Sequence, residues 1–131
     1  MIGVDTSVLV RYLVGTPAPQ ARRAARLIDG EELIGASVVA LAECAHVLRT
    51  QYGVPQRDIL DSLIALVQRE NVRITDARTD VLLAMLVRAR SLPGRPIPDA
   101  LIVGAALAAD AVPFATFDRD QGRYGIAVRE P

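Results

Sequence analysis

The stretch IGVDTSVLVRYLV, residues 2–14, sets the plan of the chain. Its first residues alternate between apolar and small or polar side chains, which predicts a short strand over 1–5. Residues 6–14 then predict a helix, which the proline-containing run at 16–19 stops. Asp5 therefore lies where a strand passes into a helix.

The same alternation of short strands and helices continues along the sequence. The further strands that we predict are 33–36, 72–75, 112–116 and 126–128. The further helices that we predict are 20–29, 37–52 with Ser37 as its cap, 56–68, 76–90 and 99–110. Strands separated by helices predict a three-layer α/β/α domain with a short, mostly parallel sheet. Active sites in such folds lie beyond the carboxyl ends of the strands.

The composition suits one domain, residues 1–131, with a core of aliphatic side chains. Apolar residues make up 51% of the chain and aromatic residues only 4%, so recognition of bases by aromatic stacking is disfavoured. The formal net charge is zero, which argues against a strongly basic protein that coats nucleic acid. All 15 basic residues are arginine; without lysine, Schiff-base and P-loop chemistry are excluded.

The chain shows no sign of secretion or membrane insertion. Cys44 is the only cysteine, so an internal disulfide is impossible. The first residues lack the features of a signal peptide, and no uncharged apolar run is long enough to span a bilayer. We expect a soluble, cytoplasmic protein.

Three acidic residues occupy positions that suit an active site in this fold. Asp5 follows the first predicted strand, Asp118 follows the fourth, and Asp99 opens a helix. Each also has a simpler explanation, because Asp is a common helix cap and a common turn residue.

Glu43 is harder to explain by local structure. It is the only acidic residue in VVALAECAHVL, residues 38–48, a segment apolar on nearly every side and therefore expected to be largely buried. A buried carboxylate must be neutralised, paired or bound to a cation.

Taken together, the four carboxylates of Asp5, Glu43, Asp99 and Asp118 predict a site for a hard divalent cation. Four converging carboxylates repel one another unless a cation lies between them. Such a cation can polarise a phosphodiester and lower the pKa of a bound water. Zinc is disfavoured, because the chain has one cysteine and one histidine.

The segments around these residues resemble the PIN-domain ribonucleases, and within them the VapC toxins of type II toxin–antitoxin systems. The resemblance runs over essentially the whole chain. It rests on four segments in order: VDTSVLVRYL (4–13), SVVALAECAHVLRTQYG (37–53), PDALIVGAALA (98–108) and FATFDRD (114–120).

The resemblance implies a Mg²⁺- or Mn²⁺-dependent endoribonuclease whose metal-binding and catalytic residues are Asp5, Glu43, Asp99 and Asp118. It further implies a homodimer that a cognate VapB-like antitoxin inhibits. The substrate class it implies is RNA (tRNA, rRNA or mRNA), with the particular target left open.

Other polar residues are candidates for supporting roles. Thr6 and Thr116 are placed to orient the metal-binding carboxylates, although Thr6 also suits a helix start. Asp120 lies two residues after Asp118, so either could be the fourth ligand. The resemblance favours Asp118, because Thr116 matches the Ser, Thr or Asn that precedes this Asp by two positions in the family. The arginines that could hold RNA phosphates, or simply be solvated, are Arg11, Arg95, Arg119 and Arg123.

His46 and Cys44 are expected to be structural, because a metal-activated water needs no histidine and nothing around Cys44 indicates an activated thiolate. Two other enzyme classes fit poorly: an aspartyl-phosphate phosphatase needs Asp-x-Asp where the chain has Asp5-Thr6-Ser7, and a receiver domain needs a lysine. A non-catalytic RNA- or partner-binding module with the same fold remains an alternative.

Overall fold

A computed structural model describes residues 1–131, apart from the side chain of Arg119. Helices and short strands alternate along the described chain, as the sequence predicts. The elements in order are β1 (Ile2–Gly3), α1 (Thr6–Val14), α2 (Ala18–Ile28), β2 (Ile34–Ala36), α3 (Val38–Thr50), α4 (Gln56–Gln68), β3 (Val72–Ile74), α5 (Thr79–Ala89), α6 (Ile97–Ala108), β4 (Phe114–Ala115), the 3₁₀ helix η1 (Arg119–Tyr124) and β5 (Val128–Arg129).

Local signals explain where several helices begin and end. The Ser37 hydroxyl accepts a hydrogen bond from the Ala40 amide at 3.0 Å, which confirms Ser37 as the cap of α3. α1 ends at Gly15, whose φ of 82° lies in the left-handed region that favours glycine. The turn η1 was not predicted, since no apolar period marks it.

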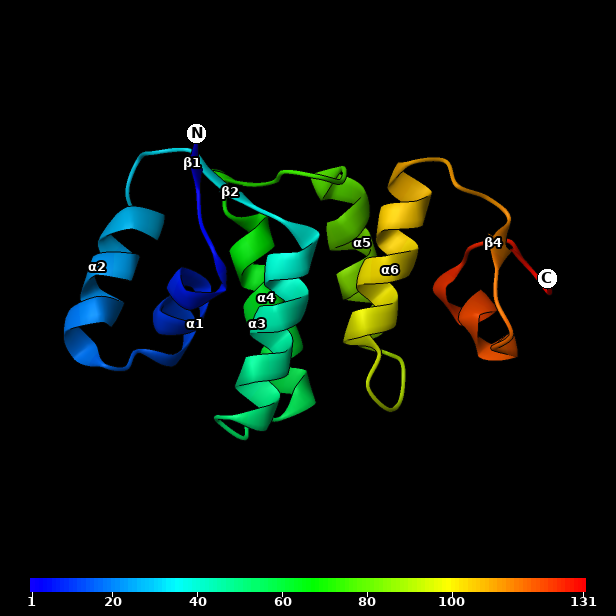
Figure 1. The fold of residues 1–131 in the computed structure, drawn as a ribbon, viewed down its shortest axis with the longest axis horizontal. Coiled ribbons are helices and arrows are strands. Elements are labelled where there is room, and N and C mark those ends of the chain that lie inside the picture. The colour runs from blue at the N-terminus through cyan, green and yellow to red at the C-terminus, as the bar shows by residue number, and fades with distance from the viewer.

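The strands form two parallel sheets rather than one. β1, β2 and β3 pair in that order, with Ile2 opposite Ile34 and Ile34 opposite Val72. β4 and β5 form a separate two-stranded sheet. Figure 1 shows β1 near one end of the molecule, beside α1 and α2, and β4 near the other end, beyond α6. The expected α/β fold with short parallel strands is confirmed, and β4 and β5 form a second sheet instead of joining β1–β3.

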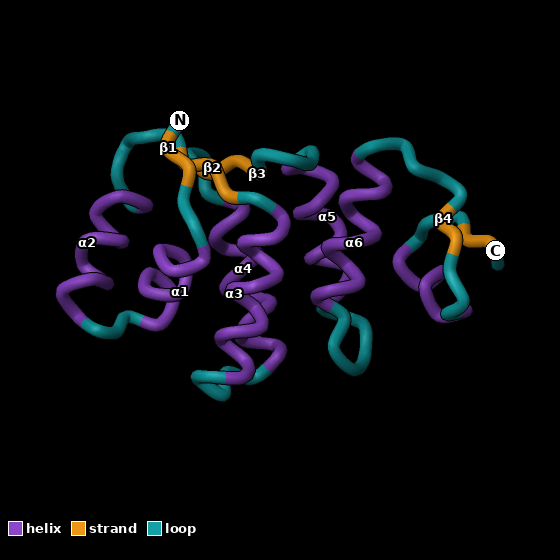
Figure 2. The backbone as a smooth tube through the Cα atoms, viewed as in Figure 1, coloured by secondary structure: helices purple, strands orange, loops and turns teal.

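Buried side chains near the end of the chain explain why the β4–β5 sheet lies apart from the β1–β3 sheet. Tyr124 and Ile126 are 1% and 4% exposed and belong to the main hydrophobic core. The turn η1 packs against α5 and α6, and the Arg88 side chain donates a 2.7 Å hydrogen bond to the Arg123 carbonyl. These contacts hold the β4–β5 pair at the α5–α6 side, away from β1, which Figure 2 shows in the separation of the strands.

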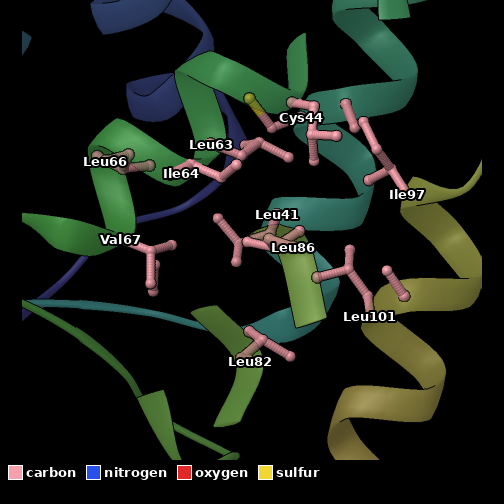
Figure 3. Close-up of a cluster of buried hydrophobic side chains, with 14 of the residues drawn as sticks. Leu41, Cys44, Leu63, Ile64, Leu66, Val67, Leu82, Leu86, Ile97 and Leu101 are labelled. Atoms are coloured by element: carbon pink, nitrogen blue, oxygen red, sulfur yellow. The ribbon is translucent and has the colours of Figure 1, made fainter. Parts of the chain in front are cut away.

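The core consists of aliphatic side chains, as the low aromatic content predicts. Figure 3 shows residues of α3, α4, α5 and α6 meeting around Leu41, Leu86 and Leu101. Each of these three leucines is at most 1% exposed. The described residues contain no helix that is both long enough and apolar enough to cross a membrane.

Candidate active site

Asp5 begins α1 as its N-cap. Its Oδ1 accepts hydrogen bonds from the Ser7 hydroxyl at 2.6 Å and from the Val8 amide at 3.2 Å. The Ser7 hydroxyl, followed by the Val8 amide, holds the pKa of Asp5 below its usual value. The Asp5 side chain is therefore an exposed, ionised carboxylate at neutral pH, and the capping role considered from the sequence is confirmed.

Thr6 connects this end of α1 to Glu43 on α3. The Thr6 hydroxyl donates a 2.9 Å hydrogen bond to Glu43 Oε2, across 37 positions of sequence. Because Thr6 directly follows Asp5, the fold brings two of the predicted acidic residues to the same surface, where α1 packs against α3. The hydrogen bond also restricts the orientation of the Glu43 carboxylate.

Glu43 is exposed, and the expectation that it is buried is wrong. α3 buries one face, consisting of Ala40, Leu41, Cys44, Ala45 and Leu48. Glu43 lies on the other face, and Val39 there is 63% exposed. A carboxylate in this position keeps its hydration, so the cost of burial does not require a cation at Glu43.

Asp99 lies in the first turn of α6, and its side chain is half-buried. The nearby Tyr124 hydroxyl donates a 3.1 Å hydrogen bond to the Pro96 carbonyl. Burial raises the pKa of Tyr124, and the negative charges of Asp99 and Asp118 raise it further. Both carboxylates therefore lie within electrostatic range of the same phenol.

Asp118 begins η1 in the same way that Asp5 begins α1. Its Oδ1 accepts a 2.9 Å hydrogen bond from the Asp120 amide, and its own amide donates a 2.9 Å hydrogen bond to Thr116 Oγ1. Thr116 therefore contacts the Asp118 backbone rather than its carboxylate. The side chains of Asp118 and Asp120 are both exposed.

The four predicted carboxylates do not form a single cluster. No three His, Cys, Asp or Glu side chains of the described residues lie close enough together to hold one metal ion. Asp5 and Glu43 share the α1–α3 surface, whereas Asp118 follows β4 at the far end of the molecule in Figure 1. The assignment of all four as site residues stays a prediction.

The donor atoms at the α1–α3 surface fit a hard divalent cation. The hydrogen bonds described above use Asp5 Oδ1 and Glu43 Oε2, and the second oxygen of each carboxylate is left for another ligand. Mg²⁺ in proteins commonly takes one or two carboxylates and keeps several waters. The two carboxylates are therefore ligands of the kind that such an ion prefers.

The predicted RNA-contacting arginines lie in different surroundings. Arg11 is half-buried on α1, where its Nε donates a 2.7 Å hydrogen bond to Gln20 Oε1. The Arg123 guanidinium lies 5.3 Å from the centre of the Tyr124 ring. Hydrogen bonding to Tyr124, with the nearby charges of Asp120 and Asp118, raises the pKa of Arg123. Arg95 is exposed, and the side chain of Arg119 lies outside the described residues.

The sequence alone does not single out Ser7, which contacts Asp5, or Arg23, which lines a groove with Ser7. Ser7 lies two positions after Asp5, a spacing at which short polar side chains commonly hydrogen-bond, so the signal was present. Arg23 lines the same groove as Ser7, and no local pattern distinguishes Arg23 from the other arginines of α2.

Cys44 and His46 make no obvious contribution to the site. Cys44 is fully buried in the core, and burial raises the pKa of its thiol to about 11, which excludes a reactive thiolate at neutral pH. The expected structural role of Cys44 is confirmed. His46 is exposed beside Arg49, with 3.5 Å between His46 Nδ1 and an Arg49 guanidinium nitrogen.

Comparison with known proteins matches the chain to one family. The model of the PIN domain matches residues 2–127, which is nearly the whole length. No curated protein matches the sequence. Because the match covers far more than half of the chain, this protein belongs to the PIN-domain family.

Proposed function

We propose that this protein is a Mg²⁺- or Mn²⁺-dependent endoribonuclease whose metal-binding residues include Asp5 and Glu43. PIN domains are generally nucleases. The single observation that supports the proposal is the 2.9 Å hydrogen bond from Thr6 to Glu43, which joins the residue next to Asp5 to the second predicted acidic residue. Asp99 and Asp118 lie near Tyr124 instead, and their part in the reaction is proposed on the resemblance alone.

The chain's own residues prepare this surface for a phosphodiester. The hydrogen bonds from Ser7 and Val8 keep Asp5 ionised, and Thr6 holds one oxygen of Glu43. A bound divalent ion would supply Lewis-acid chemistry and lower the pKa of a water. Because both carboxylates are exposed, the backbone of an RNA strand can reach them without any opening of the fold.

We further propose the VapC-type toxin role that the sequence resembles. In that role the protein is a cytoplasmic homodimer, an antitoxin of the VapB type inhibits it, and its substrate is a tRNA, an rRNA or an mRNA. The support for this finer proposal is the four ordered segments around Asp5, Glu43, Asp99 and Asp118.

The test is cleavage of RNA by the purified protein. We expect cleavage with Mg²⁺ or Mn²⁺ that EDTA abolishes, and loss of cleavage in Glu43→Gln. The matched control is Glu32→Gln, since Glu32 is an exposed carboxylate outside the proposed site. Cleavage that persists in EDTA and in Glu43→Gln would contradict the proposal.

A non-catalytic binding module is the second candidate, and the separation of Asp118 from Asp5 favours it. The two functions differ in their response to metal. A ligand of the native state raises the melting temperature by mass action. Mn²⁺ should therefore raise the melting temperature of the wild type more than that of Glu43→Gln if the metal site exists; an equal response in both proteins favours the binding module.

A further inference from the structure

A groove lies between α1 and α2, and Ser7, two residues after Asp5, is part of its lining. Its volume is about 460 Å³, within the range of small-ligand sites, and its lining includes Ser7, Val8, Arg11, Gln20, Arg23 and Leu27. Ser7 is the residue whose hydroxyl contacts Asp5 at 2.6 Å. One residue that lines the groove therefore contacts one of the two carboxylates directly.

The groove is cationic. α2 has three arginines and no acidic residue within its bounds. None of the hydrogen bonds or ion pairs found among the described side chains involves Arg23, so its guanidinium is available to a ligand. The ion pairs that the described residues do form use Arg69, Arg78 and Arg90 instead. The second cation, Arg11, is held in place by its hydrogen bond to Gln20.

The remaining walls suit a nucleoside. Val8 and Leu27 are half-buried aliphatic side chains, and they give the groove an apolar surface beside its two guanidinium groups. Guanidinium groups bind phosphate through paired N–H donors. A nucleotide suits both kinds of side chain. Its phosphate carries the negative charge that Arg11 and Arg23 bind, and its base has an apolar face that can pack against Val8 and Leu27.

We propose that this groove binds the phosphate and nucleoside of an RNA strand next to the phosphodiester that is cleaved. The inference rests on the proposed ribonuclease function for its orientation, because Ser7 lies at the carboxylate end of the groove. Arg11 follows Ser7 by four residues, so it lies about 6 Å further along α1. The strand runs from Asp5 along α1 and past Arg23.

The test measures binding of single-stranded RNA in the uncleaving Asp5→Asn background. We expect Arg23→Gln to weaken binding about tenfold and to reduce the slope of log affinity against log salt by about 0.7, the contribution of one phosphate contact to a single strand. Arg23→Lys should restore the slope, since it keeps the charge.

Arg22→Gln is the matched control. Arg22 is exposed on the same helix and does not line the groove, so the RNA affinity of Arg22→Gln should stay within about twofold of the background and its salt slope should be unchanged. Arg and Gln have similar helix propensities, so neither variant should unfold α2.

Two results would overturn the inference. One is unchanged RNA affinity in Arg23→Gln, and the other is an equal loss in Arg22→Gln, which would indicate general surface charge. A polyglutamate peptide that binds in an Arg23-dependent way, with no competition from RNA, would assign the groove to an acidic protein segment and also overturn it. Cleavage is measured separately on the wild type. If the wild type cleaves RNA but Arg23→Gln binds RNA as tightly as its background, the groove proposal alone is rejected. If Arg23→Gln weakens RNA binding but the wild type does not cleave, the ribonuclease proposal alone is rejected.

Discussion

At the scale of single residues, Asp5 combines two roles that substitution can separate. As a helix cap, the Asp5 carboxylate accepts a hydrogen bond from the Val8 amide. As an ionised carboxylate, it is proposed to bind a metal ion. Asn caps a helix nearly as well as Asp, but it carries no charge. The two roles therefore respond differently to Asp5→Asn and Asp5→Ala.

We predict that Asp5→Asn lowers the rate of RNA cleavage more than about 100-fold with little change in stability. Loss of a residue that only hydrogen-bonds to a metal ligand costs about 10- to 100-fold, so loss of the ligand itself should cost more. Asp5→Ala should lose the same activity and also about 1 kcal/mol of stability, measured by urea unfolding. Equal activity of Asp5→Asn and wild type would leave Asp5 with the capping role only.

The lowered pKa of Asp5 also predicts a pH dependence. Because the pKa of the folded state lies below that of the unfolded chain, the contribution of Asp5 to stability is present above about pH 4. It is lost as the pH falls through the folded-state pKa. Urea unfolding between pH 5 and 2 should therefore show a shallower loss of stability in Asp5→Asn than in the wild type.

Thr6 is predicted to act through Glu43. Thr6→Val removes the donor to Glu43 Oε2 while keeping the side chain's size, so apparent metal affinity should fall about 10- to 100-fold. Titration of cleavage with Mn²⁺ measures this change, and high Mn²⁺ should recover part of the activity. Thr6→Ser, which keeps the hydroxyl, should behave like the wild type; a structural role alone would leave the metal titration of Thr6→Val unchanged.

At the scale of elements, α6 shows how two neighbouring residues differ in their importance for the fold. Leu101 is 1% exposed in the core, and Ile102 is 56% exposed. Leu101→Ala should lower the free energy of unfolding by about 2–5 kcal/mol, because it leaves a cavity. Ile102→Ala should change it by less than about 0.5 kcal/mol. Similar losses in both variants, measured by urea unfolding, would mean that Ile102 is covered in solution.

At the scale of the whole molecule, several exposed apolar side chains could be buried in the proposed homodimer. Val39, Ile102 and Phe117 are 63%, 56% and 82% exposed. Burial of such side chains between two copies would contribute to association. Light scattering after size exclusion should then give twice the 14.1 kDa of one chain, with a melting temperature that rises with protein concentration. A single-chain mass at high micromolar concentration would reject the homodimer.

Much of the fold and part of the candidate site could be predicted without coordinates. Helix caps and breaks depend on a few neighbouring residues, and so Ser37 as the cap of α3 and the helix at Gln56–Gln68 were predicted correctly. The acidic residues on which the resemblance to PIN domains rests lie in such local motifs. Their order along the chain is a property of the sequence, and it needs no knowledge of packing.

Tertiary packing alone decided which acidic residues lie together and which surfaces stay open. Glu43 is exposed because the core takes only one face of α3, through Leu41, Cys44 and Leu48. Asp118 is held apart from Asp5 because Tyr124 and Ile126 are buried with α5 and α6. Both outcomes depend on contacts between segments far apart in sequence, and their free energies are set by the arrangement of the whole core rather than by any local pattern.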